Sequence, residues 1–209
     1  MSQQAYWESA GAQKEFTTPL QLGAFQALVH RSARVLDLGC GYGRTLSELH
    51  RSGYTNTVGV DFSAKMVERG RSAYPHLTLQ AMGNGTAPFA DNAFDSVLLL
   101  AVLTCIASDD EQAQLLREAR RVLKPGGVLY VNDFLLNTDE RNRKRYDEFY
   151  AKHHTYGVFE LPDGAILRHH SRKAAEEKLQ YFEKICFEEI TYPTMNGHQS
   201  NGYYYFGKK

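Results

Sequence analysis

Short apolar runs alternate with longer amphipathic segments over the first two thirds of the chain. The runs are too short for helices and rich in branched residues, as is typical of strands buried in a parallel sheet. They lie at 34–38, 57–60, 77–81, 94–100 and 128–134. The segments between them carry helix signals, for example Ser108 with Glu111, the pattern of a capping box. This alternation predicts an α/β fold in which a mostly parallel, doubly wound sheet has helices on both faces.

The N-terminal 32 residues carry helix signals without an apolar run. Residues 2–16 mix polar and aromatic side chains and predict a short helix. Thr18 followed by Pro19 predicts the start of a second helix. The core-facing stripe of that helix would be Leu20, Phe25, Leu28 and Val29. We therefore expect residues 1–32 to form an N-terminal helical cap.

The pattern changes after residue 134. Residues 135–170 are polar and aromatic with little periodicity, and a segment of this length between sheet elements is more often functional than passive. Ser171 predicts the start of a last helix, to about residue 184, and strands are expected at 187–192 and 202–207. The length of 209 residues fits one domain over 1–209, with 135–170 as an inserted lid or acceptor segment.

A glycine-rich turn follows the first apolar run, in the pattern Asp37-x-Gly39-x-Gly41-x-Gly43. Glycines at such a turn allow positive φ and let a ligand approach the backbone closely. The turn does not match a dinucleotide fingerprint, because Arg44 and Leu46 stand where the last glycine would be, and it lacks the Gly-Lys-Ser/Thr end of a P-loop. The carboxylate of Asp37 would repel a diphosphate. The pattern therefore favours a cationic ligand.

The glycine motif resembles that of class I S-adenosylmethionine-dependent methyltransferases. Three further matches follow in register: Asp61 at the end of the next strand, residues 82–95, and the sequence 121–127 before the fifth strand. Together they cover about residues 33–134. The resemblance implies a Rossmann-like sheet of seven strands with an antiparallel strand at its edge, and S-adenosylmethionine as cofactor with S-adenosylhomocysteine as product.

The resemblance also implies which residues contact the cofactor. Asp61 would hold the ribose hydroxyls, and it follows Gly41 by about the distance that a strand-helix-strand unit requires. Asn84 stands where the family often has aspartate, yet its amide oxygen can accept a hydrogen bond from the adenine amino group. The full set is Asp37, Gly39, Cys40, Gly41, Asp61, Phe62, Met66, Gly83, Asn84, Gly85 and Ala101. As alternatives, Asp37 or Asp61 could cap a turn or helix, Phe62 and Met66 could be core residues, and Cys40 is a small loop residue rather than a nucleophile.

The acceptor side is predicted from the least regular segments. Arg168, His169 and His170 could orient a polar or anionic group, and the N-terminal helix with Tyr6 could close over the cofactor. The alternative is a solvated loop whose tyrosines pack on the sheet. A dedicated base is optional for methyl transfer, with the loop histidines as candidates. We predict no metal site, because adjacent histidines point in different directions and a third ligand is missing.

The composition of the chain argues against two classes of binding partner, nucleic acids and membranes. The 24 basic and 24 acidic residues balance, and the basic ones are scattered, which argues against nucleic acid. The short basic run 141–145 is interpreted as a solvated helix face. An apolar stretch long enough to span a membrane and a signal peptide are both missing, and the three cysteines lack metal or redox spacing, so we expect a cytoplasmic protein without membrane contacts.

These observations predict methyl transfer to a nitrogen, oxygen or sulfur atom of a small-molecule acceptor. The acceptor and the oligomeric state are left open. Two alternatives are a nucleotide-cofactor oxidoreductase of the NAD type on a related fold, and a non-catalytic protein that retains the cofactor pocket.

Overall fold

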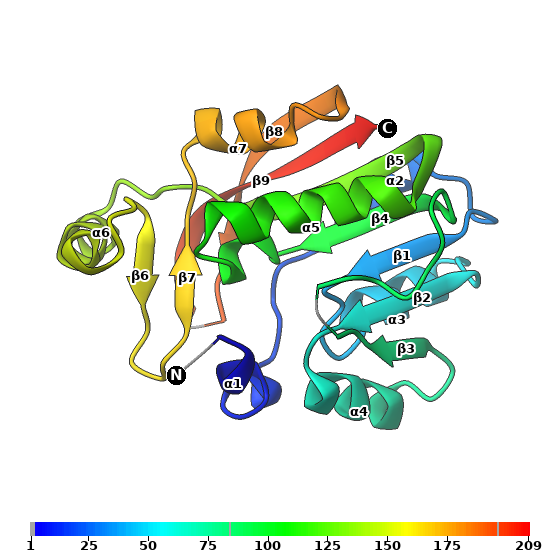
Figure 1. The fold of residues 1–209 in the computed structure, drawn as a ribbon, viewed down its shortest axis with the longest axis horizontal. Helices are drawn as coiled ribbons and strands as arrows, with labels where there is room; N and C mark the ends of the chain where they lie inside the picture. Colours follow the sequence, from blue (N-terminus) through cyan, green and yellow to red (C-terminus); the bar gives the residue numbers. More distant parts are fainter. Residues whose placement is uncertain (1–2, 84, 196) are drawn as a thin grey trace.

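A seven-stranded sheet with the order β3-β2-β1-β4-β5-β9-β8 runs through the molecule (Figure 1). The computed structural model describes residues 3–83, 85–195 and 197–209. The strands are β1 (Val35–Leu38), β2 (Thr57–Asp61), β3 (Thr78–Ala81), β4 (Phe94–Leu100), β5 (Leu123–Phe134), β8 (Glu183–Pro193) and β9 (Gln199–Lys208). The first five pair in parallel, and β9 runs antiparallel between β5 and the edge strand β8. The predicted fold class is confirmed.

Helices cover both faces of this sheet. They are α2 (Leu22–Leu28), α3 (Arg44–Arg51), α4 (Ala64–Ala73), α5 (Asp109–Val122) and α7 (Arg172–Leu179). Successive side chains of a strand point to opposite faces. Accordingly Val97 and Leu99 of β4 pack in one apolar core with α5 and α7, whereas Leu98 packs in the other with α2, α3 and α4.

Local sequence signals explain the boundaries of several helices. The side chain of Ser63 accepts a hydrogen bond from the backbone N–H of Met66 and caps α4, and Ser108 caps α5 in the same way through Glu111. Gly53, with a φ of 93°, ends the α3 turn as predicted. The starts of α4 and α5 and the end of α3 therefore agree with the sequence prediction.

Several predicted boundaries are wrong, among them that of the first helix, which was expected over residues 2–16 and ends at Trp7. Helix α2 begins at Leu22 rather than after Thr18, because Tyr130 and Asn132 of β5 hold residues 19–21 through Pro19 O and the N–H of Gln21. Leu28, expected in the core, is 40% exposed. Helix α7 ends at Leu179 rather than near residue 184, since β8 already begins at Glu183. Strand β5 begins at Leu123 rather than at residue 128, and residues 124–127 interrupt its regular pairing with β4.

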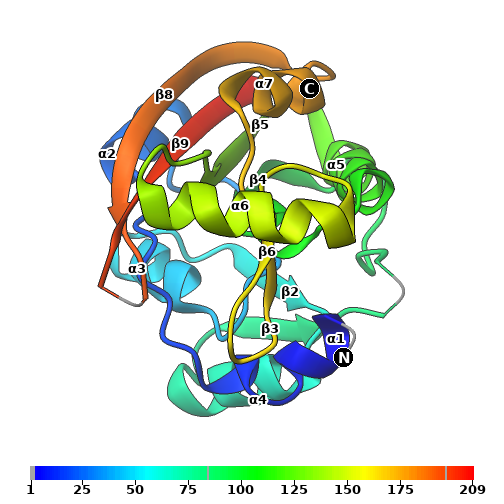
Figure 2. The ribbon, with the colours of Figure 1, turned by 90° about the vertical axis from the view of Figure 1, so that its left-hand side faces the viewer.

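The segment 135–170 is ordered rather than a solvated loop. It contains α6 (Glu140–His153) and a separate hairpin of β6 (Val158–Glu160) and β7 (Ile166–Arg168). Figure 2 shows this hairpin extending past α6 toward the N-terminal segment, which holds α1 (Gln3–Trp7) and a short 3₁₀ turn at Gly11–Gln13. Of the helices in the described ranges, none is long and apolar enough to cross a membrane.

Candidate active site

A cavity of about 750 Å³ opens where the parallel strands end. Ligands of open α/β sheets bind at this edge. Its lining includes ten of the predicted cofactor contacts, namely Asp37, Gly39, Cys40, Gly41, Asp61, Phe62, Met66, Gly83, Gly85 and Ala101. The eleventh, Asn84, lies outside the described residues. The tertiary structure therefore brings together residues that the sequence spreads over 65 positions, from Asp37 to Ala101.

The glycine turn needs its glycines for both conformation and space. Gly39 and Gly41 have φ values of 89° and 53°, in the left-handed region that disfavours residues with a Cβ. A Cβ on Gly39 would lie 2.7 Å from Cγ2 of Val102, and one on Gly41 would strike the ring of Phe16. Ala101 also has a left-handed φ, of 54°, directly after β4, and such strain is typical of functional sites.

Asp61 ties the glycine turn to the start of α4. Its Oδ2 accepts a hydrogen bond from the N–H of Gly41 at 2.8 Å, and its Oδ1 accepts one from the N–H of Ser63 at 2.9 Å. Burial raises the pKa of Asp61 to about 6, although these two bonds oppose the shift. Each carboxylate oxygen can accept a second hydrogen bond, so the anchor role and a ligand role are compatible.

Asp37 has an unsatisfied oxygen in the cavity wall. It is 2% exposed, and its Oδ1 is buried with no hydrogen-bond partner. Burial, followed by the nearby charge of Asp61, raises its pKa to about 7, and Arg44 opposes this shift. A buried carboxylate without a partner is costly. A bound ligand with a cationic or N–H group would satisfy it, which argues against a mere turn cap.

Arg44 is a site residue that the sequence analysis treated only as a break in the dinucleotide pattern. It lines the cavity next to Asp37, and its Nε is buried without a partner. One of its terminal nitrogens donates to the carbonyl of Thr18. Arg44 also pairs with Glu48 at 3.8 Å, and among the described residues it forms no ion pair with Asp37. Asp37 and Arg44 thus present opposite charges to the same cavity, and such charges fit the ammonium and carboxylate of an α-amino acid. The signal available in the sequence was a basic residue directly after the last glycine.

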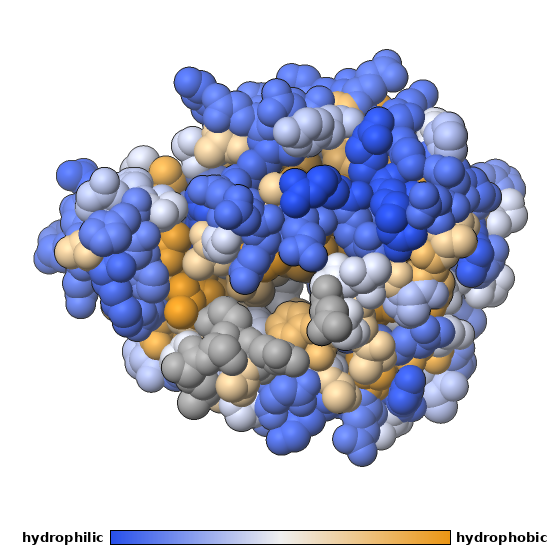
Figure 3. Space-filling model, in the orientation of Figure 1, coloured by the Kyte–Doolittle hydropathy of each residue, from blue (hydrophilic) through white to orange (hydrophobic). Residues whose placement is uncertain are grey.

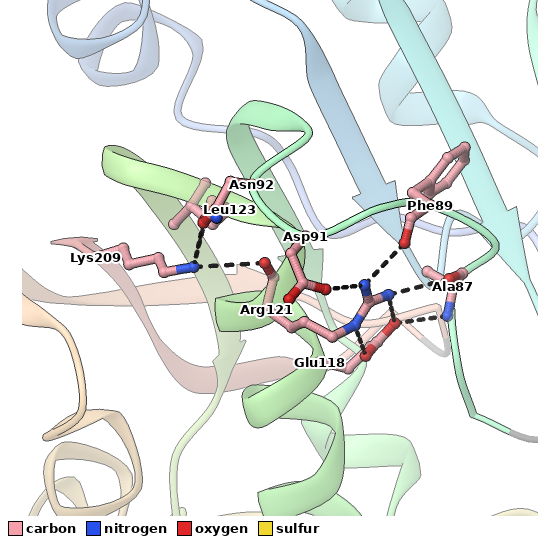
Figure 4. A network of polar contacts seen from close by, with 8 residues as sticks. All are labelled: Ala87, Phe89, Asp91, Asn92, Glu118, Arg121, Leu123 and Lys209. Atoms are coloured by element: carbon pink, nitrogen blue, oxygen red, sulfur yellow. Dashed lines mark hydrogen bonds and ion pairs between the residues drawn. The ribbon is translucent and has the colours of Figure 1, made fainter.

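The loop before β4 is fixed by an ionic network (Figure 4). The guanidinium of Arg121 donates to the carbonyls of Ala87 and Phe89 and pairs with Glu118 and Asp91 at 2.7 Å. Glu118 in turn accepts from the N–H of Ala87 at 2.7 Å. The network holds the chain that follows Gly83 and Gly85, which line the cavity.

Of the acceptor-side candidates, only His169 lines the cavity. Tyr6 instead donates to Asp163 at the tip of the β6–β7 hairpin, at 3.3 Å. Arg168 binds Ala107 O and Asp109 at 2.8 and 2.9 Å, and His170 Nε2 lies 3.0 Å from the side-chain oxygen of Gln112. These three residues dock the cap and the hairpin onto the rest of the protein. The expectation that Tyr6, Arg168 and His170 face the acceptor is corrected.

Other side chains form the roof of the cavity. Trp7 and Phe16 come from the N-terminal segment, and Phe159, Leu161 and Leu167 come from the hairpin. Helix α6 adds Arg141 and Arg145. These two arginines were interpreted as part of a solvated face. Their spacing of four residues places them on one side of a helix, and that side faces the cavity.

The cysteines and histidines show no sign of a nucleophile or a metal centre. Cys40 is buried, and its burial raises the pKa of the thiol, so it stays protonated at neutral pH. Within the described ranges, His, Cys, Asp and Glu side chains form no group of three that could hold a metal ion.

Comparison with known proteins finds similarity to methyltransferases. Residues 36–131 match the model of a methyltransferase domain. A demethylmenaquinone methyltransferase of Renibacterium salmoninarum is 38% identical over 117 residues, which make up 56% of this chain and 47% of the relative. The chain thus spans about half the length of such sequence relatives.

Solved structures share the fold. An S-adenosylmethionine-dependent methyltransferase of Methanosarcina mazei superposes with a TM-score of 0.84 at 24% identity, covering 89% of this chain and 96% of that one. A 1,6-didemethyltoxoflavin-N1-methyltransferase of Burkholderia thailandensis, solved with 1,6-didemethyltoxoflavin and S-adenosylhomocysteine, superposes with a TM-score of 0.65 at 15% identity, covering 99% and 79%. The chain thus has the fold of the class I methyltransferases, and residues 36–131 are similar to a methyltransferase domain. The cofactor of this class is S-adenosylmethionine.

Proposed function

We propose that the protein transfers the methyl group of S-adenosylmethionine to a nitrogen, oxygen or sulfur atom of a small molecule. The observation that carries this proposal is the unpartnered Oδ1 of Asp37 beside Arg44, at the end of a glycine turn that leaves room for a ligand. Phosphate ligands would be repelled by Asp37 and Asp61. The ammonium and carboxylate of S-adenosylmethionine would instead pair with the opposite charges of Asp37 and Arg44, and its sulfonium carries no negative charge that these carboxylates would repel.

Each part of the cofactor has a counterpart among the lining residues. Asp37 and Arg44 would hold the ammonium and the carboxylate of its methionine part. Asp61 would accept hydrogen bonds from the ribose hydroxyls through the lone pairs that its carboxylate oxygens still have free. The adenine ring would lie among Phe62, Met66, Gly83 and Gly85, which line the same cavity, and Cys40 and Ala101 would contribute backbone to its wall.

Methyl transfer mainly requires that the acceptor atom is aligned with the methyl group of the cofactor. The cofactor supplies a methyl group already activated by the sulfonium, and the protein places an acceptor atom in line with it. Such positioning contributes on the order of 7 to 11 kcal/mol for well-oriented reactants. Trp7, Phe16 and the β6–β7 hairpin cover the cavity, so they would keep water from the reacting atoms.

Residues 1–32 and 135–170 would act as a cap and a lid within one domain. Their enclosure of the cavity supports a small acceptor rather than a nucleic acid, as does the balance of 24 basic and 24 acidic residues. The three cysteines are free thiols, which supports a reducing, cytoplasmic setting.

Calorimetric titration tests the cofactor assignment. Separate titrations with S-adenosylmethionine, S-adenosylhomocysteine and NADH should give binding of the first two only, and tighter binding of NADH would favour the oxidoreductase. Incubation with S-adenosylmethionine and a metabolite extract should then release S-adenosylhomocysteine. Binding without any turnover would favour a non-catalytic binding protein.

A further inference from the structure

The charges on the cavity wall are divided between two sides. The acidic lining residues are Asp37, Asp61 and Glu111, which come from β1, β2 and α5. A second side holds Arg141 and Arg145 of α6 together with His169 and His198, while the remaining basic lining residue, Arg44, lies near Asp37. A cationic cofactor fits the first side. The second side calls for a different ligand.

Arg145 lacks an anionic partner. Its guanidinium carbon lies 3.6 Å from the centre of the Phe159 ring, and its Nε is buried without a hydrogen-bond partner. Among the described residues it forms no ion pair, whereas Arg141 of the same helix pairs with Asp139 at 3.9 Å. Burial lowers the pKa of Arg145, but a guanidinium stays charged at any ordinary pH. Its guanidinium also bonds the hydroxyl of Tyr146, which carries no charge, so the positive charge that lines the cavity can pair with an anion bound there.

His169 supplies a hydrogen-bond donor next to this cation. Nδ1 of His169 lies 2.7 Å from the hydroxyl of Tyr146 and 3.3 Å from the amide nitrogen of Asn137. That amide nitrogen can only donate, and the amide oxygen of the same side chain accepts from the N–H of Asn201 at 2.8 Å, so Nδ1 is the acceptor. Burial, with Arg145 as the next cause, lowers the pKa of His169 well below its usual value, and the ring is neutral. A neutral ring that accepts at Nδ1 carries its proton on Nε2. The nitrogen left for the cavity is therefore an N–H donor.

An apolar shelf surrounds these two donors. The ring of Phe134 stacks on His169 with centroids 5.5 Å apart and an interplanar angle of 19°, and Phe159 meets His169 edge-on at 4.9 Å. Leu161 and Leu167 extend the same wall. Figure 3 shows hydrophobic side chains gathered over the β6–β7 hairpin, next to the polar surface of α6. Stacked rings favour a flat partner.

We propose that the methyl acceptor is a flat organic anion, such as an aromatic carboxylate, whose anionic oxygens bind the guanidinium of Arg145 and the Nε2–H of His169. The inference rests on the proposed function, since it concerns the acceptor half of the same cavity. The rings of Phe134 and Phe159 hold the body of the acceptor. The anion is fixed on the far side from Asp37 and Asp61, which would repel it and so orient it.

The test compares acids with their neutral amides. Binding of salicylate and salicylamide, 1-hydroxy-2-naphthoate and its amide, and indole-2-carboxylate and its amide is measured by ligand-observed NMR on the protein with and without S-adenosylhomocysteine. We expect each acid to bind at least tenfold more tightly than its amide. Equal binding of acid and amide in all three pairs, or no binding of any of them, would overturn the proposal.

Variants locate the preference. Arg145→Gln should abolish the preference for the acid, Arg145→Lys should retain part of it, and Arg143→Gln, an exposed arginine of the same helix, should retain it fully. If folded Arg145→Gln still prefers the acid, the assignment is contradicted. The same holds if Arg145→Lys loses the preference more completely than Arg145→Gln does. Affinity for S-adenosylhomocysteine should stay unchanged in all three variants. A wild-type protein that does not bind this nucleoside at all would contradict the proposed function instead.

Discussion

The hydroxyl of Tyr146 and Nδ1 of His169, both buried, form a 2.7 Å hydrogen bond. We assign the hydroxyl as the donor because the amide NH₂ of Asn137, 3.3 Å from Nδ1, can only donate and so makes Nδ1 an acceptor. This bond decides what the histidine can do. With Nδ1 occupied as an acceptor and the proton on Nε2, His169 can donate a hydrogen bond to a ligand but cannot take a proton from it. A loop histidine that the sequence offered as a candidate base is thus a binding group. Methyl transfer then relies on an acceptor atom that is nucleophilic without help from His169.

The first prediction concerns this tautomer. In protein with ¹⁵N-labelled histidine, Nδ1 of His169 should show the NMR shift of an unprotonated ring nitrogen and Nε2 that of an N–H. Tyr146→Phe removes the nearer of two donors and leaves the amide of Asn137 at 3.3 Å, so the Nδ1–H form should gain population and stability should fall by about 1 kcal/mol for the lost hydrogen bond. A protonated Nδ1 in the wild type would contradict the assignment. The exposed His154 provides an internal reference in the same spectrum.

The second prediction links Asp37 to stability and pH. Its pKa is raised from 3.8 to about 7, so between these values the folded state binds more protons than the unfolded state, and stability falls as pH rises through this window. Asp37→Asn removes this loss. The variant without cofactor should therefore be more stable than the wild type at pH 8, by on the order of 2 to 4 kcal/mol, and the gain should vanish near pH 4.

The same variant should bind S-adenosylmethionine at least tenfold more weakly at pH 8, because the ligand cation loses its counter-charge. Denaturant unfolding at several pH values and calorimetry measure the two effects separately. A variant that is less stable than the wild type at pH 8 would show that Asp37 is satisfied in the fold and does not wait for a ligand.

The third prediction concerns Asp61. Asp61→Ala should weaken S-adenosylmethionine binding by a few kcal/mol, since hydrogen bonds to a charged group contribute about 1.5 to 3 kcal/mol each. Asp61→Asn should be nearly as damaging, because both carboxylate oxygens already accept backbone N–H groups and an amide NH₂ would oppose one of them. Calorimetry on both variants checks this. Wild-type affinity in Asp61→Asn would exclude contacts to both oxygens.

The fourth prediction concerns the closure of the roof. Lys14 of the N-terminal segment pairs with Asp163 of the hairpin tip at 2.5 Å, and Tyr6 donates to the same carboxylate. Because both charged side chains are partly exposed, the pair contributes about 0.2 to 1 kcal/mol. Asp163→Asn should therefore speed the release of bound S-adenosylhomocysteine by a factor of about 2 to 5, measured by stopped-flow displacement.

High salt should produce the same acceleration in the wild type and little further change in the variant. Lys144→Gln breaks a comparable exposed pair with Glu140 on the outside of α6 and serves as the control. Equal release rates in Asp163→Asn and Lys144→Gln would show that the contact does not hold the roof closed.

The sequence by itself determined the central sheet and most of the residues that meet at the ends of its parallel strands. Local sequence patterns predict strands β1, β2 and β4, each from a short apolar run, and the helix caps Ser63 and Ser108, each from a hydroxyl before a helix. Such patterns do not depend on residues far away in the chain. The predicted cofactor contacts follow the ends of successive strands. Parallel strands end at one edge of a sheet, so these residues meet whatever the rest of the chain does.

Only the tertiary structure decided which residues of the segment 135–170 line the cavity. Arg168, His169 and His170 are consecutive in a nearly extended chain, so the middle side chain points away from the two others. The sequence does not state which side faces the cavity, and packing of β7 against α5 through Arg168 and His170 turns His169 inward. In the same way, whether Arg145 meets water or the ring of Phe159 depends on where α6 lies against the hairpin. The position of α6 is set by contacts between segments far apart in the chain, and a local sequence pattern does not predict such contacts.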